Sequence, residues 1–99
     1  MTISKKLEGS KLTAVFTGRL DTMTTPDAEK ELQGSLDNIT ELVLDFEAID
    51  YISSSGLRLL LSLQKQMNAK KGTMVIRNIN ETVSEIFEVT GFSDILTVE

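Results

Sequence analysis

The stretch Leu42-Val43-Leu44-Asp45-Phe46, followed closely by Tyr51-Ile52-Ser53-Ser54-Ser55-Gly56-Leu57, decides how this chain folds. Its first part is an apolar run interrupted only by Asp45, a pattern typical of a central strand covered on both faces, as in parallel sheets. Its second part places three serines and a glycine before an amphipathic pattern, which predicts a helix from about Ser54 to Lys70. A buried strand that leads directly into a helix indicates an α/β fold with parallel crossovers.

Upstream of this stretch, the sequence predicts a β-hairpin and a helix. Apolar and polar residues alternate over 3–7 and again over 12–17, with a turn at Gly9-Ser10, which is the pattern of a hairpin. Thr25 is a good N-cap residue, and Pro26 suits the first helical position. A narrow apolar helix face follows at four-residue spacing, made of Ala28, Leu32 and Leu36.

Downstream, the helix over 54–70 ends at Gly72 and has an inner side made of Leu57, Leu60, Leu61, Gln64 and Met67. The residues 74–76 predict the next strand. Asn80 then caps a third helix, which ends at Gly91 and buries Val83, Ile86 and Phe87. The residues 95–98 predict either a short final strand or an extended tail.

The predicted order of elements is therefore β-β-α-β-α-β-α with a short final element, in a single α/β domain over residues 1–99. Strands joined by helices predict parallel neighbours in one sheet. The hairpin at the start makes this sheet of about four strands mixed, though mostly parallel. Periodicity leaves open whether the helices lie on one face of the sheet or on both.

Two missing residue types narrow the chemistry. The 99 residues include no cysteine, which excludes disulfides, thiolate nucleophiles and zinc–sulfur sites. They also include no histidine, the commonest general base and transition-metal ligand. A Ser–His–Asp triad cannot be built from this chain alone. We therefore expect no enzyme, no cofactor and no metal site.

The charge and hydropathy of the chain argue against two classes of partner. A formal charge of −5, with scattered basic residues, is unfavourable for binding nucleic acid through its phosphates. No apolar run approaches the roughly 20 residues that a membrane-spanning helix needs. The residues 1–6 lack the apolar core of a secretory signal. We therefore expect a cytoplasmic protein that has no membrane span. We also expect the free protein to be a monomer.

The serine cluster has a structural and a functional interpretation. Ser53 or Ser54 can act as an N-cap, its hydroxyl accepting a hydrogen bond from a free N–H of the first turn. The same N–H groups and the positive end of the helix dipole also tolerate an anion. A serine phosphorylated here would gain about −1.5 to −2 charges at one surface point without unfolding its own domain. Gly56 lets the backbone approach its neighbours closely.

The run from Asp45 through Tyr51-Ile52-Ser53-Ser54-Ser55-Gly56-Leu57, with Gly18-Arg19-Leu20-Asp21 and the order of elements, resembles the STAS domain of bacterial anti-sigma factor antagonists. The resemblance covers essentially the whole chain, and its most specific part is the Ser-Ser-Gly-Leu junction after a buried strand. The implied function is partner switching. The unphosphorylated antagonist binds an anti-sigma factor that is also a serine kinase, and so releases a sigma factor. The kinase then phosphorylates the antagonist, and a PP2C-type phosphatase restores it.

The resemblance implies a role for each residue of the segment. Ser54 is the phosphoacceptor, Ser55 and Gly56 follow it into the helix, and Asp21 lies on a neighbouring loop that frames the partner surface. Many family members carry an aspartate where this chain has Ser53. The additional hydroxyls leave Ser53 and Ser55 as further candidates for the acceptor. Together with Arg58, these residues form the expected partner-binding surface.

Several alternatives remain open from the sequence. Asp21 can instead satisfy turn amides, and Arg58 can be a solvated surface residue. The domain can be a STAS-like scaffold subunit that never switches, such as a transporter accessory protein. An enzyme with Ser54 as nucleophile and Asp21 or a lysine as base is the third possibility, which no spacing in the sequence supports.

Overall fold

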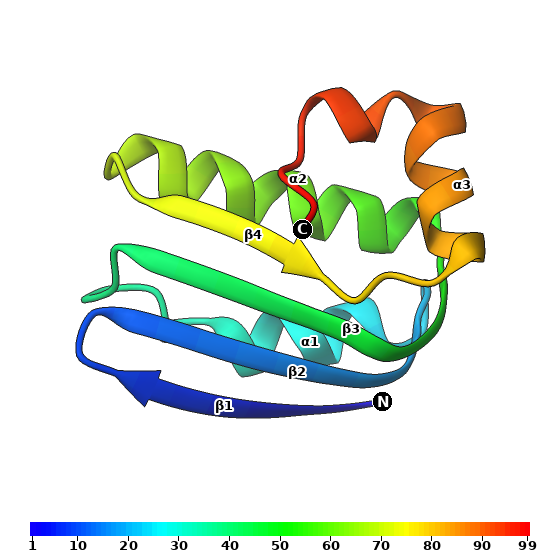
Figure 1. The fold of residues 1–99 in the computed structure, drawn as a ribbon. Helices are drawn as coiled ribbons and strands as arrows, with labels where there is room; N and C mark the ends of the chain where they lie inside the picture. The colour runs from blue at the N-terminus through cyan, green and yellow to red at the C-terminus, as the bar shows by residue number, and fades with distance from the viewer.

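The computed structural model, which describes residues 1–99, contains one four-stranded sheet in the order β1-β2-β3-β4 (Figure 1). The strands β1 (Thr2–Glu8) and β2 (Lys11–Leu20) form an antiparallel hairpin. The strands β3 (Glu41–Ile52) and β4 (Thr73–Arg77) follow as parallel neighbours. The predicted mixed, mostly parallel sheet is therefore confirmed.

Three α-helices complete the predicted order β-β-α-β-α-β-α. The helices α1 (Thr25–Leu32) and α2 (Ser54–Ala69) lie on the same face of the sheet, behind it in Figure 1. The helix α3 (Glu81–Thr90) follows β4 at the end of the sheet where the parallel strands finish, and the 3-10 helix η1 (Phe92–Asp94) comes next. No helix of this fold is both long and apolar enough to cross a membrane.

Most of the core lies between the sheet and the two helices behind it, and Val83, Phe87 and Leu96 extend it toward α3 and the C-terminal segment. It contains 23 buried apolar residues, among them Phe16 and Phe46, whose rings meet edge to face at 5.1 Å. Leu12, Ala14, Phe16 and Leu20 of β2 are buried, whereas Val15 between them is 36% exposed. On β3, Val43 faces away from the core and is half-buried, and no helix covers that front face of the sheet (Figure 1), so helices cover only one face of β3.

The strand β3 extends beyond its apolar run as far as Ile52. Two irregularities interrupt its pairing with β2. Asp45 pairs with Val15, and the next pair is Ala48 with Thr17, so Phe16 faces two residues of β3. A second shift leaves Asp50 without a partner on β2. Each bulge adds a residue and bends the strand, so β3 continues through polar residues until Ile52.

The helix α1 begins one residue earlier than predicted and ends four residues before Leu36, the last residue of its predicted apolar face. Its N-cap is Thr24 rather than Thr25, and it ends at Leu32, because Gln33 is extended and Gly34 has a positive φ of 81°. Leu36 therefore lies outside the helix. It is nevertheless buried, because the turn that follows α1 folds its side chain back into the core.

The helix α2 confirms most of the predicted inner side, including the polar Gln64. Leu61 is only half-buried, whereas Leu59 and Leu63 are buried. The buried side of α2 therefore extends further around the helix than the predicted inner side. Ile86 of α3 is likewise half-buried. Of residues 95–98, Ile95 ends η1 in a helical conformation, and the predicted final strand is reduced to one parallel bridge between Val98 and Ile76.

Candidate functional site

The serine segment and the Gly-Arg-Leu-Asp segment meet at the carboxyl ends of β2 and β3. Both strands end on the right in Figure 1, and each leads there into a helix. The backbone N–H of Ser53 donates to the carbonyl oxygen of Leu20 at 2.9 Å, which joins the two segments directly. The carboxyl ends of parallel strands are where α/β folds usually carry their binding residues.

Ser53 is the N-cap of α2. Its backbone is extended, and its hydroxyl oxygen accepts a hydrogen bond from the N–H of Gly56 at 3.4 Å. Its carbonyl oxygen accepts from Leu57 N–H at 2.9 Å, which begins the helix. The hydroxyl of Ser53 is therefore already used for capping.

The other two serines differ in exposure and in hydrogen bonding. Ser55 is half-buried, and its hydroxyl lies 3.2 Å from the hydroxyl of Thr22, in the loop after β2. Ser54 is exposed, and its hydroxyl makes no hydrogen bond within the protein. Of the three side chains, only that of Ser54 presents a free hydroxyl to an approaching enzyme.

Gly56 sits where α2 packs against the end of β2. A Cβ atom at this position would lie 2.6 Å from Ile52 Cγ1 and 2.8 Å from the carbonyl oxygen of Leu20. Both distances are below normal contact, so only glycine fits without displacing a neighbour. The role of Gly56 as a point of close backbone approach is thus confirmed.

Asp21 holds the loop between β2 and α1 in shape. Its Oδ1 accepts hydrogen bonds from the backbone N–H groups of Met23 and Thr24, at 3.0 Å each. The hydrogen bond from Thr24 N–H is the largest influence and lowers the pKa of Asp21, whereas slight burial raises it. The hydrogen bonds from Met23 N–H and the Thr24 hydroxyl and the charge of Arg19 lower the pKa further. The net pKa is below the ordinary 3.8, so Asp21 is ionised at neutral pH.

A cation and an aromatic ring flank this loop. The guanidinium carbon of Arg19 lies 5.2 Å from the ring centroid of Tyr51, and Arg19 Nε lies 3.6 Å from Asp21 Oδ2. Both contacts are exposed and contribute little to stability. The contact between Arg19 and Tyr51 joins the end of β2 to the end of β3 beside the serines.

Arg58 lies one turn beyond Ser54 on α2, exposed and free of any ion pair within the protein. It lines a hollow of about 380 Å³ between the first turns of α1 and α2, together with Thr22, Ser55 and Glu29. This hollow is open to solvent and most of its lining residues are of polar type, which suits a protein surface better than an enclosed small molecule.

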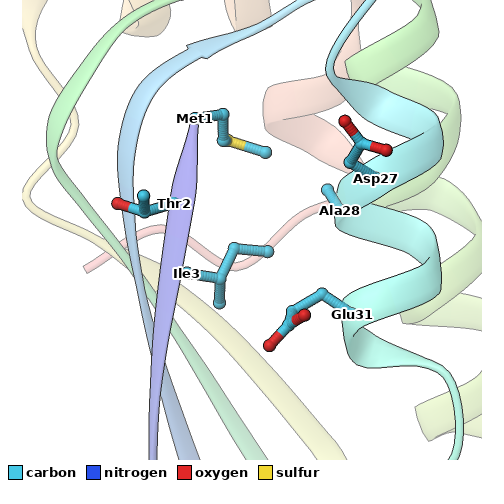
Figure 2. A pocket seen from close by; sticks show the side chains of 6 residues that line it. All are labelled: Met1, Thr2, Ile3, Asp27, Ala28 and Glu31. Carbon is cyan, nitrogen blue, oxygen red and sulfur yellow. The ribbon is translucent and has the colours of Figure 1, made fainter.

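A second hollow, of about 280 Å³, lies between β1 and α1 (Figure 2). Met1 and Ile3 point into it from the strand side, and Asp27 and Glu31 bring carboxylates from the helix side. None of the residues expected from the sequence to bind a partner lines this second hollow.

The structure places the residues that were expected to bind a partner at the same end of the sheet. Ser53, Ser54, Ser55, Gly56 and Arg58 occupy the first two turns of α2, and Asp21 shapes the adjoining loop without touching the serines. Sequence reasoning missed Thr22 and Met23. The only signal for them was their position beside Asp21, because neither belongs to a periodic pattern.

Comparison with known proteins gives one consistent result. The family model described as the STAS domain matches residues 4–99. BtrV of Bordetella bronchiseptica, named as a candidate anti-sigma factor antagonist, is 35% identical over 94 residues, which cover 94% of this chain and 80% of BtrV. The anti-sigma-B factor antagonist of Staphylococcus aureus is 28% identical over 82 residues, 82% of this chain and 76% of that protein.

Among solved structures, the Bacillus cell fate determinant SpoIIAA in its phosphorylated form matches with a TM-score of 0.76 at 17% identity. The match covers 99% of this chain and 91% of that one. At this identity the likeness shows the shared fold alone.

Proposed function

This chain belongs to the STAS domain family, and on that premise we propose that it is an anti-sigma factor antagonist controlled by phosphorylation of Ser54. Its unphosphorylated surface at the start of α2 binds an anti-sigma factor that is also a serine kinase, and this binding releases a sigma factor. The names of BtrV and of the Staphylococcus aureus relative support the first part of this proposal.

The observation that carries the proposal is the free, exposed hydroxyl of Ser54 on the first turn of α2. The neighbouring hydroxyls of Ser53 and Ser55 are held by Gly56 N–H and by Thr22, which supports Ser54 as the acceptor. In the reaction, the Ser54 oxygen forms a bond to the γ-phosphorus of ATP. The bond from that phosphorus to the bridging oxygen breaks, ADP leaves, and the hydroxyl proton is released.

The position of Ser54 explains how the phosphate can switch binding without unfolding the domain. The first-turn N–H groups and the helix dipole stabilise an anion there, and Arg58 one turn later adds a positive charge. The new charge then faces outward on the surface that meets the partner, where it makes close docking unfavourable. The protein is thus the substrate of phosphoryl transfer and not its catalyst.

The remaining parts of the cycle follow from the same proposal. A PP2C-type phosphatase removes the phosphate and restores the binding surface. The cycle takes place in the cytoplasm, where sigma factors act, and the free antagonist is a monomer.

A titration of the cognate anti-sigma factor kinase with two variants tests the proposal. Ser54→Ala should bind as tightly as the unphosphorylated protein, and Ser54→Asp should bind at least about tenfold more weakly, a loss of roughly 1.4 kcal/mol. Circular dichroism controls for folding of both variants. Equal affinity of the two would contradict the switch, and absence of binding by the wild-type protein would contradict the partner.

A further inference from the structure

Met23 is the most exposed apolar residue of the loop beside the serine segment. Its side chain is 82% exposed, whereas Met67 and Met74 are almost fully buried in the core. A single exposed apolar residue is common on protein surfaces and carries no meaning by itself. The surroundings of Met23 are what distinguish it from the comparably exposed Val89 on α3.

Several hydrogen bonds hold the backbone that carries Met23. The N–H of Met23 donates to Asp21 Oδ1, and the N–H of Thr24 donates to the same oxygen. The hydroxyl of Thr24 donates to the carbonyl oxygen of Arg19 at 2.6 Å, and the N–H of Thr25 donates to that of Asp21 at 2.9 Å. A side chain presented on a fixed backbone loses less conformational entropy when a partner covers it.

Met23 is also continuous with the serine segment. Its neighbour Thr22 is in contact with Ser55, at 3.2 Å between the two hydroxyl oxygens. On the other side, Asp21 links the loop to Arg19, which stacks over the half-exposed ring of Tyr51. These contacts place the exposed Met23 side chain, the hydroxyls of Thr22 and Ser55, and the Arg19 cation on one continuous surface.

We infer that Met23 is the apolar anchor of this surface and enters a pocket on the anti-sigma factor kinase; the inference rests on the proposed function. An anchor with an apolar side chain surrounded by polar contacts is the usual arrangement of a protein–protein hot spot. The flexible, polarizable methionine side chain suits such a pocket. The partner is therefore expected to offer an apolar cavity opposite the loop, with acidic groups near Arg19 and Arg58.

The same placement connects the anchor to the switch. A phosphate on Ser54 would stand on the turn next to the loop that carries Met23. Docking of Met23 would then require the partner to bring apolar surface close to a doubly charged phosphate, and removing water from that charge costs free energy. Phosphorylation would thus act by preventing the burial of Met23.

The test compares three variants in a titration of the purified kinase. Met23→Ala should bind about tenfold more weakly than wild type, and Met23→Leu should stay within about threefold, because leucine keeps the apolar volume. The control is Leu7→Ala. Leu7 is 63% exposed and pairs with Leu12 near the start of β2, whereas Met23 follows the other end of that strand, which lies about 26 Å further along at roughly 3.3 Å per residue, so the loss of Leu7 should leave affinity unchanged. All variants should keep the wild-type urea midpoint.

A direct readout uses the methyl groups of the four methionines. In a spectrum with labelled methionine methyls, kinase binding should shift the Met23 signal and leave those of the buried Met67 and Met74 in place. An unshifted Met23 signal, or equal affinity of Met23→Ala and wild type, would overturn the inference while the proposed function stands. If Met23→Ala binds weakly but Ser54→Asp binds normally, the anchor is supported and the phosphorylation switch fails. If wild type does not bind the kinase, both proposals fail.

Discussion

The hydroxyl of Thr22 lies 3.2 Å from the hydroxyl of Ser55, and this contact joins the loop after β2 to the first turn of α2. Together with the hydrogen bond from Ser53 N–H to the Leu20 carbonyl oxygen, it fixes the orientation of the first helical turn. Ser53 and Ser55 are consequently engaged on the protein side of the turn. Ser54 is the serine that faces solvent.

The first prediction concerns the phosphoacceptor. With the cognate kinase and ATP, Ser53→Ala and Ser55→Ala should still incorporate one phosphate, and Ser54→Ala should incorporate none, because only Ser54 has a free exposed hydroxyl. Intact-mass and peptide mass spectrometry give the measurement. As a control for structural damage, urea unfolding should show Ser53→Ala about 1 kcal/mol less stable, since it loses the N-cap, and Ser54→Ala nearly unchanged. Phosphate retained in Ser54→Ala would move the acceptor to another serine.

The second prediction concerns the close approach at Gly56. Gly56→Ala should lower the free energy of unfolding by about 1–3 kcal/mol, because the added methyl overlaps the Leu20 carbonyl oxygen and Ile52. This loss should appear even though alanine is favoured over glycine in helices by roughly 1 kcal/mol. Urea unfolding measures it. Lys65→Ala, an exposed change on the same helix, should stay within about 0.5 kcal/mol of wild type. Unchanged stability of Gly56→Ala would show that α2 can move away from β2.

Much of the fold was predictable because its elements depend on local patterns. The apolar run over 42–46, the alternation in the hairpin and the Asn80 cap each indicate an element without knowledge of its neighbours, and the cap is confirmed by the hydrogen bond from Val83 N–H to Asn80 Oδ1 at 2.8 Å. The bulges of β3 have no such signature, because Asp50 becomes unpaired only through the register with β2.

In the candidate site, too, the features set by local sequence were predictable and those set by contacts between distant residues were not. The cluster of serines before an amphipathic helix pattern predicts that a serine caps the N-terminus of that helix. By contrast, the sequence does not indicate that the segments of Asp21 and Ser53 lie next to each other. Which serine keeps a free hydroxyl depends on Thr22, a contact across 33 positions of sequence. The displacement of the α1 N-cap to Thr24 likewise depends on Asp21, which accepts the Thr24 N–H and so ends the loop one residue early.

The third prediction concerns a buried polar atom in α2. Gln64 is 9% exposed, and its Oε1 has no hydrogen-bond partner, although its Nε2 donates to Asn68 at 3.0 Å. Gln64→Met keeps the length of the side chain and removes the unpaired acceptor, so it should raise the free energy of unfolding by about 1 kcal/mol. Gln66→Met, an exposed change on the same helix, is the matched control and should change it by less than about 0.5 kcal/mol. A destabilised Gln64→Met would indicate that Oε1 has a partner, such as a bound water.

The fourth prediction concerns Asp45, the one charge in the apolar run of β3. Its Oδ1 accepts from Glu47 N–H at 3.0 Å and from Asn78 Nδ2 at 3.2 Å, and its Oδ2 lies 3.4 Å from Arg77 Nε. Burial alone would raise the pKa of Asp45, but these hydrogen bonds and the Arg77 charge outweigh it and bring the pKa below 3.8. The carboxylate therefore ties the bulge of β3 to the end of β4.

Because the folded-state pKa of Asp45 lies below its unfolded value of 3.8, the unfolded chain takes up the proton first as the pH falls. The stabilisation by the carboxylate is complete well above pH 3.8 and disappears as the pH falls through the lower folded value. Asp45→Asn should accordingly cost about 1–3 kcal/mol at pH 7, and its difference from wild type should shrink as the pH falls below 3.8. Urea unfolding from pH 7 down to the acid transition measures both curves. The pKa of Asp21 is also lowered, so the same pH series on Asp21→Asn measures the part of the pH dependence that comes from Asp21. A difference that stays constant with pH would show that the Asp45 charge does not contribute to the link between β3 and β4.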